Sequence, residues 1–136
     1  MSRVLALDFG EARCGCAISD PTGTLATPLP VVERPATRRG LTRVVQLVEE
    51  RAAERVVVGL PLSLSGGEGP QALRTREWAE RLSARVRVPV ELHDERLTTR
   101  QAARAGGSAD EDSRAAAHLL EAYLAAPAGA SGGRRA

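Results

Sequence analysis

Residues 3–19, RVLALDFGEARCGCAIS, hold two apolar runs that are separated by a short polar tip. The first run, residues 3–9, is rich in β-forming side chains and is followed by Gly10, which is typical of a buried strand. The second run, residues 13–18, begins directly after the tip formed by residues 10–12. We therefore expect the two runs to pair as an antiparallel hairpin at the start of the fold.

A third strand is expected over residues 24–32 (TLATPLPVV), after a turn at Thr22-Gly23. Pro28 and Pro30 lack the N–H group that a central strand donates to its neighbours, so this strand is predicted at an edge of the sheet. The three strands together would form an antiparallel meander.

After the meander, the spacing of apolar residues changes from that of a strand to that of a helix. Thr37 is a candidate N-cap, and apolar residues recur behind it at helical spacing. The remaining elements are expected as a strand over residues 55–60 (RVVVGL), a helix over about 69–84, a strand over 88–93 (VPVELH), a short helix over about 97–105 and a last helix over about 111–125. This order predicts an α/β domain with a mixed five-stranded sheet flanked by helices, as in the RNase-H-like fold.

The chain has 136 residues, which is the length of one domain and excludes a two-domain kinase or a (β/α)₈ barrel. At 43% hydrophobic residues it can bury a core, but only 2% are aromatic, so the base-stacking platforms of many RNA-binding modules are nearly absent. We expect one domain over residues 1–126. Residues 127–136 contain nothing that could pack, and we expect them to be disordered.

The charges nearly balance, with 19 basic and 17 acidic residues, and every basic residue is arginine. Arginine suits phosphate contacts, although a GC-rich genome explains the same composition. Cys14 and Cys16 are too few for a disulfide framework. No apolar run approaches the roughly 18 residues of a membrane span, and the start of the chain lacks the layout of a signal peptide. A cytoplasmic protein that does not bind membranes is expected.

Three carboxylates stand out by their positions. Asp8 ends the first strand inside an apolar run, where a charge is costly unless it is paired or bound to a metal. Asp112 shares one helical face with Ala116 and Leu119, so it is expected to point toward the sheet. Glu95 follows the fifth strand. If the first and fifth strands lie near each other, the three acids converge at one edge of the sheet.

Clustered carboxylates repel one another unless a cation lies among them or a pKa rises. Their oxygens suit Mg²⁺ or Mn²⁺, which can activate water and stabilise the leaving oxygen in phosphodiester hydrolysis. Simpler interpretations stay open at this point. Asp112 could be a helix-dipole acid with Asp110 as the N-cap, and Asp94 could cap a helix that begins near Leu97.

Candidates for phosphate contacts lie in the same regions. They are Arg13, at the start of the second strand, and Arg96, Thr98, Thr99 and Arg100, around the start of the expected short helix. Arg96 and Arg100 are four residues apart and would share one helical face, which could equally be a solvated surface. Gly59 could allow a nucleic-acid backbone to approach closely, or it could belong to an ordinary strand-to-helix turn.

Four segments carry a resemblance to a known family: LALDFGEARCGCAISD (5–20), VVVGLPLSLSGG (56–67), VELHDERLTTRQA (90–102) and DSRAAAHLLEAYL (112–124). In this order and spacing they resemble the YqgF/RuvX family, described as Holliday-junction resolvases and as nucleases that mature pre-16S ribosomal RNA. The resemblance covers nearly the whole chain except the tail. It implies an RNase-H-like fold, a cytoplasmic location and nuclease chemistry dependent on Mg²⁺ or Mn²⁺, with Asp8, Glu95 and Asp112 as the catalytic and metal-holding acids.

This chain departs from the family pattern at two places. Related resolvases carry an acid on the fourth strand, where this chain has Gly59 and Leu60, so Glu95 would have to supply that charge from the neighbouring strand. The loop over residues 106–111 (GGSADE) is short and acidic, whereas many relatives have a longer basic segment.

Two hypotheses about function follow. The first is a metal-dependent endonuclease that acts on structured nucleic acid, either pre-16S rRNA or branched DNA, as a monomer or homodimer. The second is a nucleic-acid-binding factor without catalysis that acts in ribosome maturation or transcription. The three acids favour the enzyme, while the low net charge and the missing fourth-strand acid favour the binding factor.

Overall fold

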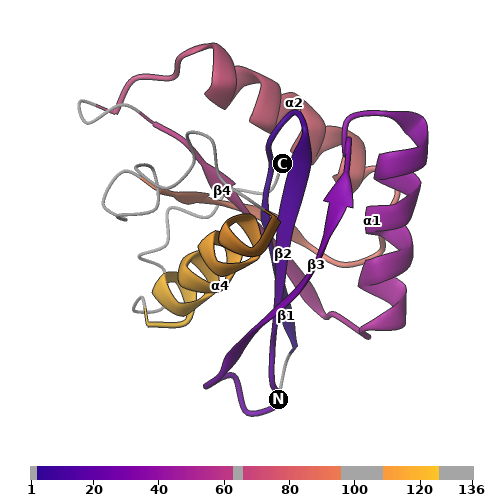
Figure 1. The fold of residues 1–136 in the computed structure, drawn as a ribbon, viewed down its shortest axis with the longest axis vertical. Helices are drawn as coiled ribbons and strands as arrows, with labels where there is room; N and C mark the ends of the chain where they lie inside the picture. Colours follow the sequence, from indigo (N-terminus) through magenta and orange to yellow (C-terminus); the bar gives the residue numbers. More distant parts are fainter. Residues whose placement is uncertain (1–2, 63–65, 96–108, 126–136) are drawn as a thin grey trace.

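A five-stranded mixed sheet forms the centre of the protein, in the order β3-β2-β1-β4-β5 (Figure 1). The structure is a computed structural model, and it describes residues 3–62, 66–95 and 109–125. The strands are β1 (Val4–Asp8), β2 (Arg13–Ser19), β3 (Ala26–Glu33), β4 (Arg55–Leu60) and β5 (Val90–Asp94), and the helices are α1 (Arg38–Glu50), α2 (Pro70–Ser83) and α4 (Ala109–Ala125).

The pairing of the strands confirms the predicted fold class. β1, β2 and β3 pair antiparallel, whereas β4 lies parallel to both β1 and β5. β3 is an edge strand, as Pro28 and Pro30 predict. The helix expected over residues 97–105 and the tail over residues 127–136 lie outside the described residues.

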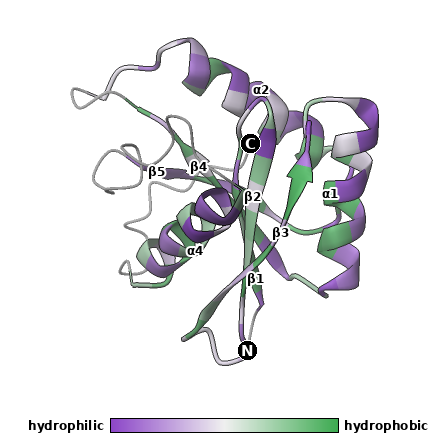
Figure 2. Ribbon diagram, viewed as in Figure 1, coloured by the Kyte–Doolittle hydropathy of each residue, from purple (hydrophilic) through white to green (hydrophobic). Residues whose placement is uncertain are grey.

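The two faces of the sheet are covered by different helices. Leu5 and Leu7 belong to the larger core with α1 and α2, and Trp78 of α2 stacks on Phe9 with ring centroids 4.7 Å apart. Ala6 belongs to the smaller core against α4, together with Val4, Ala17, Val57, Ala116, Leu119 and Leu120. Figure 2 shows hydrophobic and hydrophilic residues alternating along α1, as in a helix with one buried side. Because side chains alternate along a strand, Asp8 lies on the α4 side of the sheet.

α1 begins where the sequence predicts. Thr37 is its N-cap, and the Thr37 hydroxyl accepts a hydrogen bond of 3.0 Å from the backbone N–H of Gly40. A cap of this kind satisfies one of the N–H groups that the first turn leaves without a helical partner. In the part of the chain that the structure describes, no helix is both long and apolar enough to cross a membrane.

Candidate active site

Asp8 lies at the end of β1, between two glycines on the neighbouring strands. It pairs with Gly15 of β2, and the register of β1 with β4 places Gly59 at its other side, one residue beyond the Leu7–Val58 pair. The Asp8 residue is only 4% exposed. Since neither glycine has a side chain, the space on both sides of Asp8 is open to groups from other elements.

Gly15 brings α4 into contact with β2. A Cβ atom at Gly15 would lie 2.7 Å from the backbone carbon of Asp112 and closer still to its carbonyl oxygen. Real side chains do not tolerate such distances, so only glycine lets the first turn of α4 approach the strand this closely. The contact brings Asp112 to the end of β2, and Asp112 lines the same cavity as Asp8.

Gly59 has the same role for Glu95. A Cβ atom at Gly59 would lie 2.6 Å from Oε2 of Glu95, and closer to its Cδ and Oε1. The backbone N–H of Glu95 donates a hydrogen bond of 3.2 Å to the carbonyl of Leu60, and the Glu95 side chain is fully buried. The carboxylate of Glu95 therefore covers the end of β4, although the residue itself follows β5.

The three carboxylates thus lie in a row across one edge of the sheet. Asp112 covers β2, Asp8 is at the end of β1, and Glu95 covers β4. β4 lies between β1 and β5, so these two strands are not direct neighbours in the sheet. Because Gly59 has no side chain, the Glu95 side chain has room to reach over β4. The space at Gly59 is filled by this chain's own carboxylate, which argues against the interpretation that a nucleic-acid backbone approaches there.

An open cavity of about 310 Å³ lies at this edge of the sheet. Its lining includes Asp8, Arg13 and Asp112, together with Gln71 of α2 and residues 10–12 of the hairpin tip. Asp8, Arg13 and Asp112, predicted from distant parts of the sequence, therefore meet in one place. Gln71 was not among the predicted site residues, because a lone glutamine in a helix carries no recognisable pattern.

Arg13 and Asp112 form an ion pair in this cavity, with 2.7 Å between Nε and Oδ2. The hydrogen bond to Asp112 raises the pKa of Arg13, with burial opposing it. The two side chains are 29% and 21% exposed, so solvent still reaches both. The pair orients the carboxylate of Asp112.

The donor chemistry of this edge fits a magnesium or manganese ion, because both ions prefer carboxylate oxygens and no soft ligand is found among the described residues that line the cavity. Asp8 and Asp112 share the cavity, and Glu95 lies over the adjacent strand. Within residues 3–62, 66–95 and 109–125, no three His, Cys, Asp or Glu side chains are already close enough together to hold an ion. These carboxylates are therefore candidate ligands, but among the described residues they are not close enough together to surround an ion.

Some of the predicted residues cannot be placed. Arg96, Thr98, Thr99 and Arg100 lie outside the described residues, so their contact with phosphate stays a prediction. Asp110 lies within α4 rather than before it, so the interpretation of Asp110 as the N-cap is wrong. Asp94 is the last residue of β5.

Residues 2–126 of the chain match the RuvX family, which is described as Holliday junction resolvase. The chain belongs to the RuvX family. A relative from Syntrophomonas wolfei, named "putative pre-16S rRNA nuclease", is 38% identical over 131 residues, which are 90% of this chain and 93% of the relative. Relatives of the same name from Chloroflexus aurantiacus and Streptomyces avermitilis are 47% and 50% identical, each over 71% of this chain and 63% of the relative.

The fold of this RuvX family member is also similar to that of a solved structure. That structure is Thermus thermophilus RuvC in complex with a Holliday junction substrate, with a TM-score of 0.56 and 16% identity over the full length of both chains. Similarity at this level of identity shows a shared fold, the RNase-H-like sheet with its helices. It confirms the fold that the sequence predicts.

Gly15 is not singled out from the sequence, and Gly59 is considered there only for a nucleic-acid backbone or a strand-to-helix turn, not for the approach of Glu95. Each of the two glycines lies in a buried strand, where glycine is unfavourable by itself. An isolated glycine inside a strand often marks a close approach of another group. That signal is present in both strands, but it does not say which group approaches.

Proposed function

We propose that this RuvX protein is a metal-dependent endonuclease that hydrolyses phosphodiester bonds in structured nucleic acid. The observation that carries the proposal is the row of Asp112, Asp8 and Glu95 across the ends of β2, β1 and β4 beside an open cavity. Three acids at one edge repel one another when no cation lies among them. Such an arrangement of carboxylate oxygens is suited to holding a divalent cation.

Each side chain has a distinct role in the proposed site. Asp8, Glu95 and Asp112 would hold Mg²⁺ or Mn²⁺, which supplies activation of water and stabilisation of the leaving oxygen. Arg13 lies on the wall of the cavity and can donate to a phosphate oxygen of the bound strand. Its ion pair with Asp112 keeps both groups oriented before substrate binds.

We infer that the substrate is the pre-16S ribosomal RNA, whose ends the protein would process. The names of the relatives from Syntrophomonas wolfei and Chloroflexus aurantiacus support this choice. The family description and the RuvC-like fold support branched DNA as the alternative substrate. Arg96, Thr98, Thr99 and Arg100 would extend the phosphate contacts next to Glu95.

The test is an incubation of the purified protein with labelled pre-16S RNA and with a labelled four-way DNA junction. Each substrate is incubated with Mn²⁺, with Mg²⁺ or with EDTA, and the products are resolved on a denaturing gel. We expect cleavage of the RNA with either metal and none in EDTA. Cleavage of the DNA junction but not of the RNA would show that branched DNA, rather than pre-16S RNA, is the substrate. Full activity in EDTA would exclude the metal-dependent mechanism.

Two variants separate the protein's own activity from that of a contaminating nuclease. Asp8→Asn removes the central acid and keeps its shape, and it should lower cleavage by orders of magnitude. Glu54→Gln removes one exposed carboxylate just before β4, at the opposite edge of the sheet, and should leave cleavage unchanged. Binding without cleavage by the wild-type protein on both substrates would favour the non-catalytic binding factor.

A further inference from the structure

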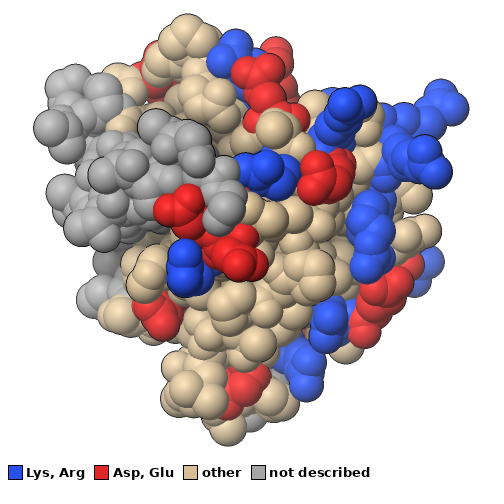
Figure 3. Space-filling model, viewed as in Figure 1, with Lys and Arg blue, Asp and Glu red and all other residues tan. Residues whose placement is uncertain are grey.

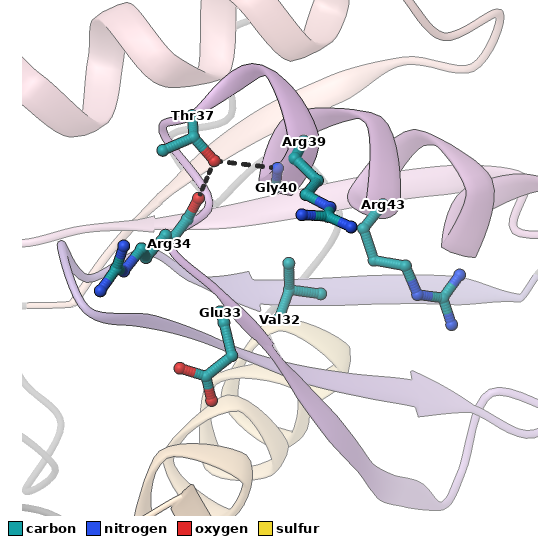
Figure 4. A pocket seen from close by; sticks show the side chains of 7 residues that line it. All are labelled: Val32, Glu33, Arg34, Thr37, Arg39, Gly40 and Arg43. Atoms are coloured by element: carbon teal, nitrogen blue, oxygen red, sulfur yellow. Dashed lines mark hydrogen bonds between the residues drawn. The ribbon is translucent and has the colours of Figure 1, made fainter.

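A second cavity, of about 510 Å³, lies between the edge strand β3 and the first turns of α1. Three arginines line it: Arg34, Arg39 and Arg43. Figure 4 shows Arg39 and Arg43 extending from successive turns of α1, with Val32 between α1 and the strand. The side chains of all three arginines are exposed. We call this cavity, with its three arginines, the arginine groove.

Among the described residues, one acid lines the groove, and it does not neutralise the arginines. Glu33 follows Val32 on β3, and its carboxylate points to the opposite side of the strand, toward α4 (Figure 4). Glu33 lies opposite Arg13 in the register of β2 with β3, and its charge adds to the rise in the pKa of Arg13 that Asp112 mainly causes. In Figure 3, basic side chains gather on the side of the molecule where α1 lies. The groove therefore presents a local positive charge, although the whole chain has a net charge of only +2.

Folding does not explain these arginines. Arg39 lies in the first turn of α1, which contains no acid, and cations are unfavourable there because of the helix dipole. Arg34 adopts a positive φ of 43°, a conformation that is uncommon for a residue with a side chain. Arg43 forms an ion pair of 3.2 Å with Glu50, but both groups are half-exposed, and such pairs stabilise a protein little.

The arginine groove adjoins the candidate active site. The backbone N–H of Arg34 donates a hydrogen bond of 2.9 Å to the carbonyl of Ala12. Ala12 and Arg13 both line the cavity of the carboxylates. The hairpin tip therefore contacts Arg34 and also lines the carboxylate cavity, so the groove lies next to that cavity.

We propose that the arginine groove binds the sugar–phosphate backbone of the nucleic-acid substrate on one side of the scissile bond. This inference rests on the proposed function, since it assigns a path to the strand that the carboxylates would cut. Guanidinium groups form bidentate contacts with phosphate, and the contacts carry no information about sequence. Thr37, the other polar side chain on the α1 side of the groove, is engaged as the helix cap. The groove therefore increases affinity equally for all sequences.

The test compares two variants that lose the same charge. The first carries Arg34→Gln, Arg39→Gln and Arg43→Gln, which keep part of each side-chain stem. The matched control carries Arg51→Gln, Arg85→Gln and Arg87→Gln, three exposed arginines outside the groove. Binding of labelled single-stranded RNA is measured in EDTA at several salt concentrations, so that no cleavage is needed. A thermal melt of each variant verifies the fold.

For the groove variant, we expect a slope of log affinity against log salt that is smaller by about 2, because each arginine that neutralises a phosphate of a single strand accounts for roughly 0.7 of the slope. In the control variant this slope should decrease less than in the groove variant. When the RNA is shortened stepwise from either end, shortening from one end should abolish the difference between wild type and the groove variant. Cleavage at substrate concentrations well below KM should fall together with the affinity, because kcat/KM includes the lost contacts.

The possible failures can be told apart. If the groove variant and the control have equal slopes and affinities, the proposal that the groove binds nucleic acid is wrong and the nuclease proposal is unaffected. A slope that falls equally in both variants would likewise overturn the groove proposal, because the effect would then come from overall charge. If the wild-type protein cleaves neither substrate but binds RNA through the groove, the nuclease proposal fails and the groove stands as a binding surface. If the wild-type protein does not bind nucleic acid, both proposals fail.

Discussion

At the scale of single residues, the candidate site depends on Gly59 as much as on the acids. Gly59→Ala introduces a methyl group into the space that the Glu95 carboxylate occupies, with 2.6 Å to Oε2. Glu95 must then move, and a displacement of about 1 Å at a catalytic group costs roughly 100-fold in rate. We expect cleavage to fall by this order, and a single-turnover cleavage assay measures it.

The control for this prediction is Gly69→Ala. Nothing lies within 4 Å of a Cβ atom at Gly69, which is the N-cap of α2. This variant should keep wild-type activity. Wild-type activity in Gly59→Ala as well would show that the position of Glu95 does not matter for the reaction.

Cys14 makes stability depend on pH. It is fully buried in the larger core, and burial raises the pKa of its thiol well above the ordinary 9.0. A raised pKa contributes stability that is fully present below the pKa of the unfolded chain and is lost as the pH rises above it. The free energy of unfolding should therefore fall above pH 9.0, by up to about 1.4 kcal/mol for each pH unit until the native thiol ionises.

Urea unfolding at pH 8 and pH 10 measures this loss, with Cys14→Ala as the comparison. The variant lacks the thiol, so its free energy of unfolding should fall less between the two pH values. An equal fall in wild type and variant would assign the alkaline loss to other groups.

The three acids could be singled out from the sequence, but their arrangement could not, and their catalytic role stays a prediction. Asp8 is a charged residue in an apolar run, and Asp112 shares a helical face with apolar residues. Glu95 could be placed only after β5. That its side chain reaches over β4 depends on the absence of a side chain at Gly59, and no periodicity in the sequence encodes such a contact between strands.

At the scale of elements, the position of α4 is set by its contact with β2 at Gly15. Gly15→Ala would press a methyl group against the backbone of Asp112, with 2.7 Å to its carbonyl carbon. Backbone atoms of a helix cannot yield as a flexible side chain can, so α4 must shift as a body. We expect a loss of roughly 1–3 kcal/mol in the free energy of unfolding, as for other overpacked sites. Cleavage should fall too, because Asp112 moves with the helix.

Urea denaturation and the cleavage assay together test this prediction. Gly69→Ala again serves as the control for activity, since it adds the same methyl group in open space, and its own loss of stability reports only the cost of alanine at an N-cap. A Gly15→Ala variant as stable and as active as wild type would contradict the close contact between β2 and α4.

Where the position of a strand or the first residue of a helix depends on local chemistry, the sequence predicts it. Pro28 and Pro30 restrict β3 to an edge, and Thr37 fixes the start of α1. The start of α4 is harder to predict, because three acids in its first turn each suit either a cap or a first-turn position. The sequence therefore allows Asp110 as the cap, whereas this residue lies inside the helix.

At the scale of the whole molecule, the distribution of charge matters more than its sum. A net charge of +2 gives no reason to expect nucleic-acid binding. The fold separates the charges, with acids across the ends of β2, β1 and β4 and arginines over β3 and α1. Composition alone cannot reveal this separation, because it arises when distant segments such as Arg34 and Ala12 come together.

We propose that Asp8, Glu95 and Asp112 form one cation site. Thermal unfolding of the protein with and without Mn²⁺ tests it most directly, with Asp8→Asn and Glu54→Gln measured beside the wild type. An ion that binds only the native state at 100 times its Kd adds about 2.7 kcal/mol to the free energy of unfolding. We predict this gain for wild type and Glu54→Gln and none for Asp8→Asn, which should melt no lower than wild type in EDTA. A gain in Asp8→Asn equal to that of wild type, or no gain in the wild type, would contradict the account.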